Sequence, residues 1–229
     1  MRRTRSWANP VSAFAPTQIS NLFAWYDASS LVGADGSRIA SWPDKTGVGG
    51  NALTQGVGTA QPWLYTSTAS RQMNGRPTAY ADGSDTIAAS YALSQPVTYV
   101  CAAANMAGAA NGRVMDTLNA TRQLIDFGAP AATSQIYAGT VQAGAVTPVG
   151  SHTMAVVFNG ASSVLHVDGV NAAIGSPGAN GNGQLTLFGS GQGTYLTGMI
   201  GEFLIYNRAL TAPEISQLES YLRSKWATT

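Results

Sequence analysis

The sequence contains few cysteines and few charged side chains. A single cysteine, Cys101, excludes an intrachain disulfide framework and a cysteine-based zinc site. It stands in the apolar run 97–104, so we expect it to be buried as a small hydrophobic residue. Asp, Glu, Lys and Arg make up 10% of the 229 residues, and the net charge is +1. This balance gives no electrostatic reason to expect binding to nucleic acid or to a membrane surface.

Glutamate is also scarce, which bears on catalysis. The three glutamates are Glu202, Glu214 and Glu219, and the last two fall in a predicted C-terminal helix. Glycoside hydrolysis usually needs two carboxylates that flank the scissile bond, about 5–10 Å apart. The sequence contains neither Asp-x-Glu nor Glu-x-Asp, and the two histidines, His152 and His166, lack the Gly-x-Ser-x-Gly context of a hydrolase nucleophile. The sequence therefore predicts a protein that is not an enzyme.

Long hydrophobic runs and repeats are missing as well. No apolar run is long enough to span a bilayer, so we expect no membrane insertion. The basic start at residues 1–5 is not followed by the apolar core of a secretion signal. We therefore expect synthesis in a cytoplasm, with release by assembly or lysis. No fixed-period repeat occurs, which argues against a propeller.

The first 18 residues show neither strand nor helix periodicity. We interpret residues 1–18 as an N-terminal arm and residues 19–229 as one domain. Aromatic and arginine side chains are enriched at interfaces, so those in the arm are candidates for partner binding. They are Arg2, Arg3, Arg5, Trp7 and Phe14. A frayed terminus without function is the alternative.

The rest of the chain is a series of short apolar segments separated by turns. The predicted strands cover 22–26, 38–42, 76–81, 96–104, 113–116, 122–127, 134–138, 153–158, 163–167, 170–174, 184–188 and 198–206. Asn159-Gly160 and Asp168-Gly169 fit two-residue hairpin turns, in which both central residues have positive φ. Short strands with frequent turns are typical of a β-sandwich.

The C-terminal segment predicts a strand followed by the one strong helix. Apart from Glu202, both faces of the strand at 198–206 are apolar, so we expect other structure on both sides of it. Thr211 and Glu214 have the spacing of a helix capping box. The helix then carries one apolar stripe, formed by Ile215, Leu218 and Leu222.

The end of the domain resembles laminin G-like, concanavalin A-like jelly-roll domains of the type found in bacteriophage virion proteins. The resemblance lies in Ile200-Gly-Glu-Phe-Leu-Ile-Tyr-Asn-Arg-Ala-Leu-Thr211 and the helix after it. Leu22-Phe-Ala-Trp-Tyr-Asp27 and Asn74-Gly-Arg-Pro77 are similar to that family's opening blocks. The resemblance covers roughly residues 17–226. It implies an all-β jelly-roll sandwich with one C-terminal amphipathic helix, an extended N-terminal arm, and a first strand beside the last.

The resemblance implies a function that needs no catalysis. We expect a non-enzymatic structural protein at the virion surface, either a capsid decoration protein or a tail-associated protein, anchored in part by the arm. Its partners would be other capsid or tail proteins and further copies of itself. The alternative is a glycan-binding module that recognises the host-cell surface. Six aromatic residues are available for sugar binding, but the sequence does not single one out: Trp42, Trp63, Tyr65, Tyr91, Tyr137 and Tyr195.

Asp82-Gly-Ser-Asp85 is the one weak candidate for a metal site. It offers two carboxylates in a loop, and calcium takes six to eight oxygen ligands. Several laminin G-like relatives bind calcium at a rim. A turn in which an Asp accepts hydrogen bonds from its own backbone explains the spacing equally. We therefore predict a turn and no cofactor, with calcium as the less favoured alternative.

Overall fold

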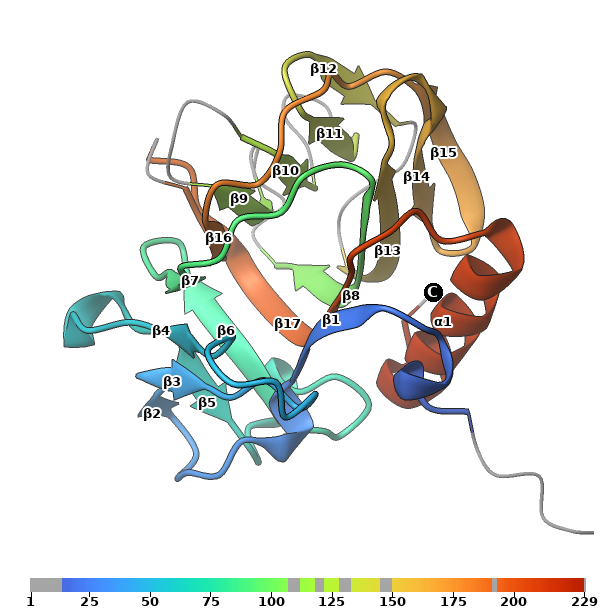
Figure 1. The fold of residues 1–229 in the computed structure, drawn as a ribbon. Helices are drawn as coiled ribbons and strands as arrows, with labels where there is room; N and C mark the ends of the chain where they lie inside the picture. Colours follow the sequence, from blue (N-terminus) through green and yellow to red (C-terminus); the bar gives the residue numbers. More distant parts are fainter. Residues whose placement is uncertain are drawn as a thin grey trace, which may run out of the picture.

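The computed structural model describes residues 14–106, 112–117, 122–127, 133–144, 150–190 and 193–228. The predicted partner-binding residues Arg2, Arg3, Arg5 and Trp7 lie outside the described residues. Two antiparallel sheets face each other, with one C-terminal helix (Figure 1). This confirms the predicted β-sandwich.

The first sheet has nine strands. In spatial order they are β15 (Val170–Gly175), β14 (Ser163–Val167), β13 (Gly150–Phe158), β8 (Val97–Asn105), β17 (Thr197–Tyr206), β6 (Thr78–Asp82), β5 (Trp63–Tyr65) and β2 (Ser37–Arg38), with β1 (Leu22–Asp27) also paired to β17. β17 is central: β8 pairs along one edge, while β6 and β1 share the other. The first strand therefore lies beside the last, as the resemblance implied.

The second sheet has eight shorter strands. In spatial order they are β12 (Val141–Ala143), β11 (Gln135–Tyr137), β10 (Leu124–Asp126), β9 (Arg113–Thr117), β16 (Leu185–Leu187), β7 (Ile87–Ala89), β4 (Leu53–Thr54) and β3 (Ser41–Trp42). Apolar side chains fill the space between the sheets, and they include Tyr99, whose ring contacts those of Phe158 and Phe203. Cys101 is 1% exposed, as expected, and burial raises its pKa to about 12.

The helix α1 (Ala212–Trp226) covers the outer face of the first sheet, against β8 and β13 (Figure 1). The predicted capping box is present, with the backbone N–H of Thr211 donating to the Glu214 carboxylate at 2.9 Å. The stripe formed by Ile215, Leu218 and Leu222 is buried against the sheet. As expected, β17 is covered on both faces. Among the described residues, no helix has the length and apolar character needed to cross a membrane.

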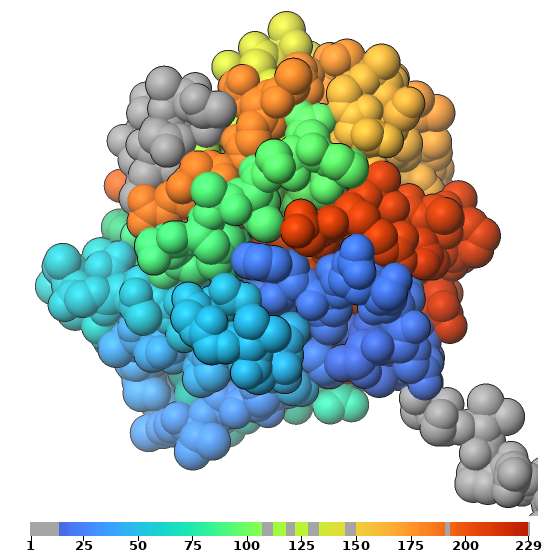
Figure 2. Space-filling view, viewed as in Figure 1, coloured from blue at the N-terminus to red at the C-terminus, as the bar shows by residue number. Residues whose placement is uncertain are grey.

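The N-terminal segment lies beside this helix (Figure 2). Residues 14–18 belong to the predicted arm, yet the structure places them on the domain. Pro16 is buried, and its carbonyl accepts a hydrogen bond from the Tyr206 hydroxyl at 2.9 Å. The start of the described chain thus lies on the sheet that the C-terminal helix covers.

One of the two predicted hairpin turns is wrong. Asp168 and Gly169 have φ of 53° and 80° and connect β14 to β15 as predicted. Asn159 instead has φ of −152°, and a short 3-10 helix, η5 (Gly160–Ser162), widens the connection. The hydroxyl of Ser163 accepts from the N–H of Asn159 at 2.8 Å and donates to the carbonyl of Gly160 at 2.7 Å. The Ser163 side chain therefore satisfies two backbone groups of this wider connection.

Gly201 on β17 provides a test of how tightly α1 packs on the sheet. A Cβ atom at this position would lie 2.6 Å from a ring carbon of Trp226. We expect Gly201→Ala to lower the free energy of unfolding by about 1–3 kcal/mol, because a close-packed core cannot absorb the added methyl group. Chemical denaturation measures the change. Gly56→Ala is the control, since nothing lies within 4 Å of a Cβ there; equal stability of the two variants would contradict close packing at Gly201.

Candidate functional site

A buried carboxylate joins α1 to the first sheet. Glu202 on β17 is fully buried. Its oxygens accept hydrogen bonds from Trp25 Nε1 (2.6 Å), Tyr221 Oη (2.9 Å), Lys225 Nζ (2.7 Å) and Trp226 Nε1 (2.7 Å). The four donors come from β1 and α1, so a single side chain ties together three elements. The oxygens of Glu202 are therefore engaged in contacts that connect these elements.

Asp27 on β1 extends this network. It accepts hydrogen bonds from Lys225 Nζ at 2.8 Å and Lys45 Nζ at 2.7 Å. Burial alone would raise the pKa of Asp27, but the hydrogen bonds from Lys225 and Lys45 outweigh it and lower the pKa below its ordinary value. This contribution to stability is therefore present above the pKa of the unfolded chain and is lost as the pH falls through the folded pKa.

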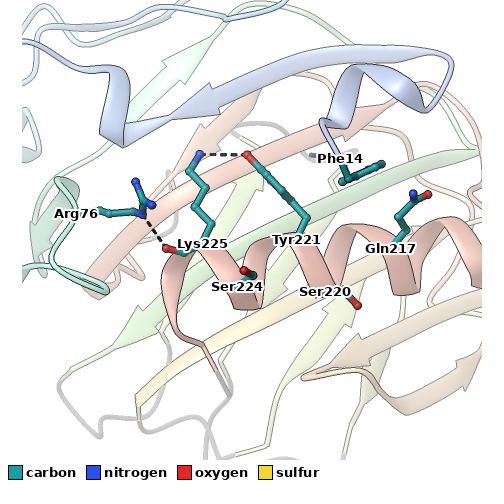
Figure 3. A pocket seen from close by; sticks show the side chains of 7 residues that line it. All are labelled: Phe14, Arg76, Gln217, Ser220, Tyr221, Ser224 and Lys225. Carbon is teal, nitrogen blue, oxygen red and sulfur yellow. Dashed lines mark hydrogen bonds between the residues drawn. The ribbon is translucent and has the colours of Figure 1, made fainter. Parts of the chain in front are cut away.

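A groove runs along α1 beside this network (Figure 3). Its volume is about 630 Å³, and it is lined by Phe14, Arg76, Gln217, Ser220, Tyr221, Ser224 and Lys225. The rings of Phe14 and Tyr221 meet edge to face, with centroids 5.8 Å apart. Arg76 Nε donates to the backbone carbonyl of Lys225 at 2.8 Å, at the C-terminal end of the helix. The N-terminal segment, the loop before β6 and α1 thus form one concave surface, which we call the α1 groove.

Of the five predicted partner-binding residues, Phe14 is the one that the structure describes, and it lies in the α1 groove. The other lining residues were missed. Gln217, Ser220 and Ser224 are polar positions on the exposed side of the predicted helix. Helical spacing shows that they share a face, but not that a loop from a distant part of the chain brings Arg76 to that face.

Charged side chains also gather on the second sheet. Arg113 contacts two carboxylates, with Nη1 3.2 Å from Asp116 Oδ2 and Nη2 3.3 Å from Asp126 Oδ2. Both aspartates are fully buried. Asp116 pairs across the sheet with Thr186, which is also buried. Burial raises the pKa of Asp116, and the opposing effect of Arg113 is smaller.

Two carboxylates therefore do converge, although no Asp-x-Glu pair occurs in the sequence. Asp116 and Asp126 come from neighbouring strands, β9 and β10. No short spacing in the sequence therefore predicts that they converge. One guanidinium bridges them, and a second, Arg122, lies 3.6 Å from Asp116. In a glycosidase the substrate lies between the two carboxyl groups. Here Arg113 contacts both, and the cluster is one of ion pairs.

The two carboxylates of the loop at 82–85 have different interaction partners. Asp82 Oδ1 accepts from the N–H and the hydroxyl of Ser84, at 3.2 and 2.8 Å. Asp85 is ion-paired to Arg38 at 2.7 Å and accepts from the N–H of Asp82 at 3.1 Å. In the part of the chain that the structure describes, no three His, Cys, Asp or Glu side chains form a group that could hold a metal ion. The contacts of both aspartates are those of a turn and an ion pair.

The sandwich, its terminal helix and the pairing of first and last strands define a lectin-like jelly-roll domain. The sequence matches the family of the concanavalin A-like lectin/glucanases superfamily over residues 82–216, and the chain belongs to that family. No curated protein matches the sequence. The family includes both binding and hydrolytic proteins by its name, so membership establishes the fold and leaves the activity to the site.

Solved structures show the same fold at low sequence identity. Domain 4 of AbnA, an extracellular arabinanase from Geobacillus stearothermophilus, in complex with arabinotriose, is 16% identical with a TM-score of 0.61, covering 87% of this chain and 98% of that one. An arabinofuranosidase complexed with arabinofuranosyl-xylobiose is 12% identical with a TM-score of 0.64, covering 82% and 51%. Trypanosoma rangeli sialidase is 12% identical with a TM-score of 0.55, covering 92% and 34%. The chain thus spans about a third of the sialidase and half of the arabinofuranosidase.

Lys225 tests the buried network. Its side chain is 15% exposed and contacts both Asp27 and Glu202. We expect Lys225→Met to lower the free energy of unfolding by about 3 kcal/mol, because two buried carboxylates lose a shared cation. Chemical denaturation at neutral pH measures the loss.

Lys45→Met is the matched control for this prediction. Lys45 contacts Asp27 as well, but its side chain is 33% exposed. Exposed ion pairs contribute about 0–1 kcal/mol, so we expect a much smaller loss. Similar losses in the two variants would show that Lys225 has no special place in the network.

Proposed function

We propose that this chain is a non-enzymatic structural protein of a bacteriophage virion, which decorates the capsid or is associated with the tail. The observation that carries the proposal is the fixed base of the arm. Phe14 packs on Tyr221, and the carbonyl of Pro16 accepts a hydrogen bond from the hydroxyl of Tyr206. A partner that binds the arm would therefore be held at one defined place beside α1. The resemblance noted in the sequence supplies the virion context.

The state of the buried carboxylates supports the non-enzymatic part of the proposal. Glu202 accepts hydrogen bonds from four donors, and Asp27 accepts hydrogen bonds from two lysines. Asp116 and Asp126 share the guanidinium of Arg113. When a carboxyl group acts as a general acid or base, it exchanges a proton with the substrate. These four are instead engaged in contacts that hold the fold together.

Removal of residues 1–13 tests the anchoring role. This truncation keeps Phe14, and with it the α1 groove. We expect an unchanged melting temperature and at least about a tenfold loss of affinity for particles assembled without this protein, equivalent to about 1.4 kcal/mol of binding free energy. Co-sedimentation with such particles measures it. Full decoration by the truncated chain would show that the arm is not the anchor.

We propose glycan binding as a second function, which can coexist with the first on one protein. The likeness to a whole domain whose structure holds arabinotriose supports it, together with a groove of about 630 Å³. Small-ligand sites commonly measure about 300–1,000 Å³. The function would be recognition of a host-cell surface.

An array of bacterial cell-wall polysaccharides tests this second function. We expect one class of glycan to bind at micromolar concentration, equivalent to about −8 kcal/mol. The same array probed with heat-unfolded protein controls for non-specific adhesion. If no glycan on the array binds at concentrations where the protein decorates particles, the glycan-binding proposal is wrong and the structural role is the one that remains.

A further inference from the structure

The α1 groove carries a positive charge and no negative one. Its lining consists of two aromatic rings, three small or amide side chains and two cations, and none of these residues is an aspartate or glutamate. Lys225 is not free to meet a ligand, since its Nζ is held by Asp27 and Glu202. The charge that faces the groove is therefore that of Arg76.

Arg76 is positioned with part of its guanidinium unused. Nε donates to the carbonyl of Lys225 at 2.8 Å, which fixes the plane of the group. Within the described part of the chain, neither terminal nitrogen has a hydrogen-bond partner, and the residue is exposed. A guanidinium held at Nε presents its two terminal nitrogens as a fork, which matches the two oxygens of a carboxylate.

The aromatic side of the groove is rigid. Tyr221 donates its hydroxyl to the buried carboxylate of Glu202 at 2.9 Å, so its ring cannot turn freely. Phe14 meets this ring at 71°, and the two form a corner (Figure 3). Aromatic faces of this kind provide apolar contact area at a low cost in conformational entropy. The C–H face of a sugar ring would pack on such a corner.

Hydrogen-bonding groups lie on both sides of the corner along α1, with Ser224 towards Arg76 and Gln217 on the other side (Figure 3). Among the described residues, the side chains of Gln217 and Ser224 have no hydrogen-bond partner, and both line the groove. An amide offers donors and an acceptor, and a hydroxyl offers one donor and an acceptor. Sugar hydroxyls need this mixture.

We propose that the α1 groove binds an acidic glycan, with the carboxylate of a uronic acid residue on Arg76 and a sugar ring against Tyr221 and Phe14. Gln217 and Ser224 form hydrogen bonds with the hydroxyl groups of the glycan. This inference rests on the glycan-binding function proposed above and adds the site and the class of sugar. The chain's own arm is the less suitable occupant, because Arg2, Arg3 and Arg5 have the same charge as Arg76.

Calorimetric titration of the full chain with tetragalacturonate, and with its fully methyl-esterified and therefore uncharged counterpart, tests the proposal. We expect the acidic tetramer to bind at least about tenfold more tightly, a difference of about 1.4 kcal/mol. Arg76→Gln should abolish this preference. Arg76→Lys should restore only part of it, because an ammonium lacks the planar fork.

Arg71→Gln is the matched control. Arg71 lies over the ring of Tyr80, outside the groove. Its substitution by Gln removes one positive charge, as Arg76→Gln does. This variant should bind the acidic tetramer as the original chain does. Equal affinities for the two tetramers, or an Arg76→Gln variant that keeps the preference, would overturn the proposal.

Three further outcomes separate this inference from the functions on which it rests. Binding of neutral glycans on the array, without binding of tetragalacturonate, would overturn the inference and leave glycan binding standing. Binding of tetragalacturonate by the chain without residues 1–13, but not by the full chain, would show that the arm occupies the groove and would overturn the inference for the full protein. Silence in both assays would overturn glycan binding altogether while leaving the virion role untouched.

Discussion

The buried carboxylate of Glu202 is the interaction on which the rest of this structure depends. Moving an ionised carboxylate out of water costs several kcal/mol unless its oxygens are fully satisfied. Here four donors from β1 and α1 satisfy it, and each donor must arrive in a given direction. These hydrogen bonds, together with the close packing of Trp226 on Gly201, set the position of α1 and of everything that α1 carries.

The α1 groove is a consequence of that position. Tyr221 and Lys225 belong to both the buried network and the groove wall. One end of each side chain is fixed by a carboxylate, and its other atoms are left to form a surface. The same helix end holds Arg76 through the carbonyl of Lys225. A binding site supported in this way needs little reorganisation, which favours recognition by shape and charge.

The second sheet carries a cluster of buried charged residues that pair with one another. Asp116 and Asp126 converge, and Arg113 contacts both. The solved structures with this fold include proteins that cleave glycans, yet they share only 12–16% of their residues with this chain. Sequence identity at that level supports a shared backbone fold and nothing more. The contacts of the individual side chains are the support for the binding role proposed above.

Local signals in the sequence determined much of the fold. Thr211 and Glu214 mark the start of α1, and Asp168-Gly169 marks a hairpin, because these contacts form between residues a few positions apart. The tertiary structure decided the rest. The Asn159-Gly160 connection is wider than predicted, and Gln95, 65 residues away, accepts a hydrogen bond from the N–H of Gly160 within it. Arg76 reaches α1 across 149 residues. Such contacts depend on which strands pair, and no short spacing records that pairing.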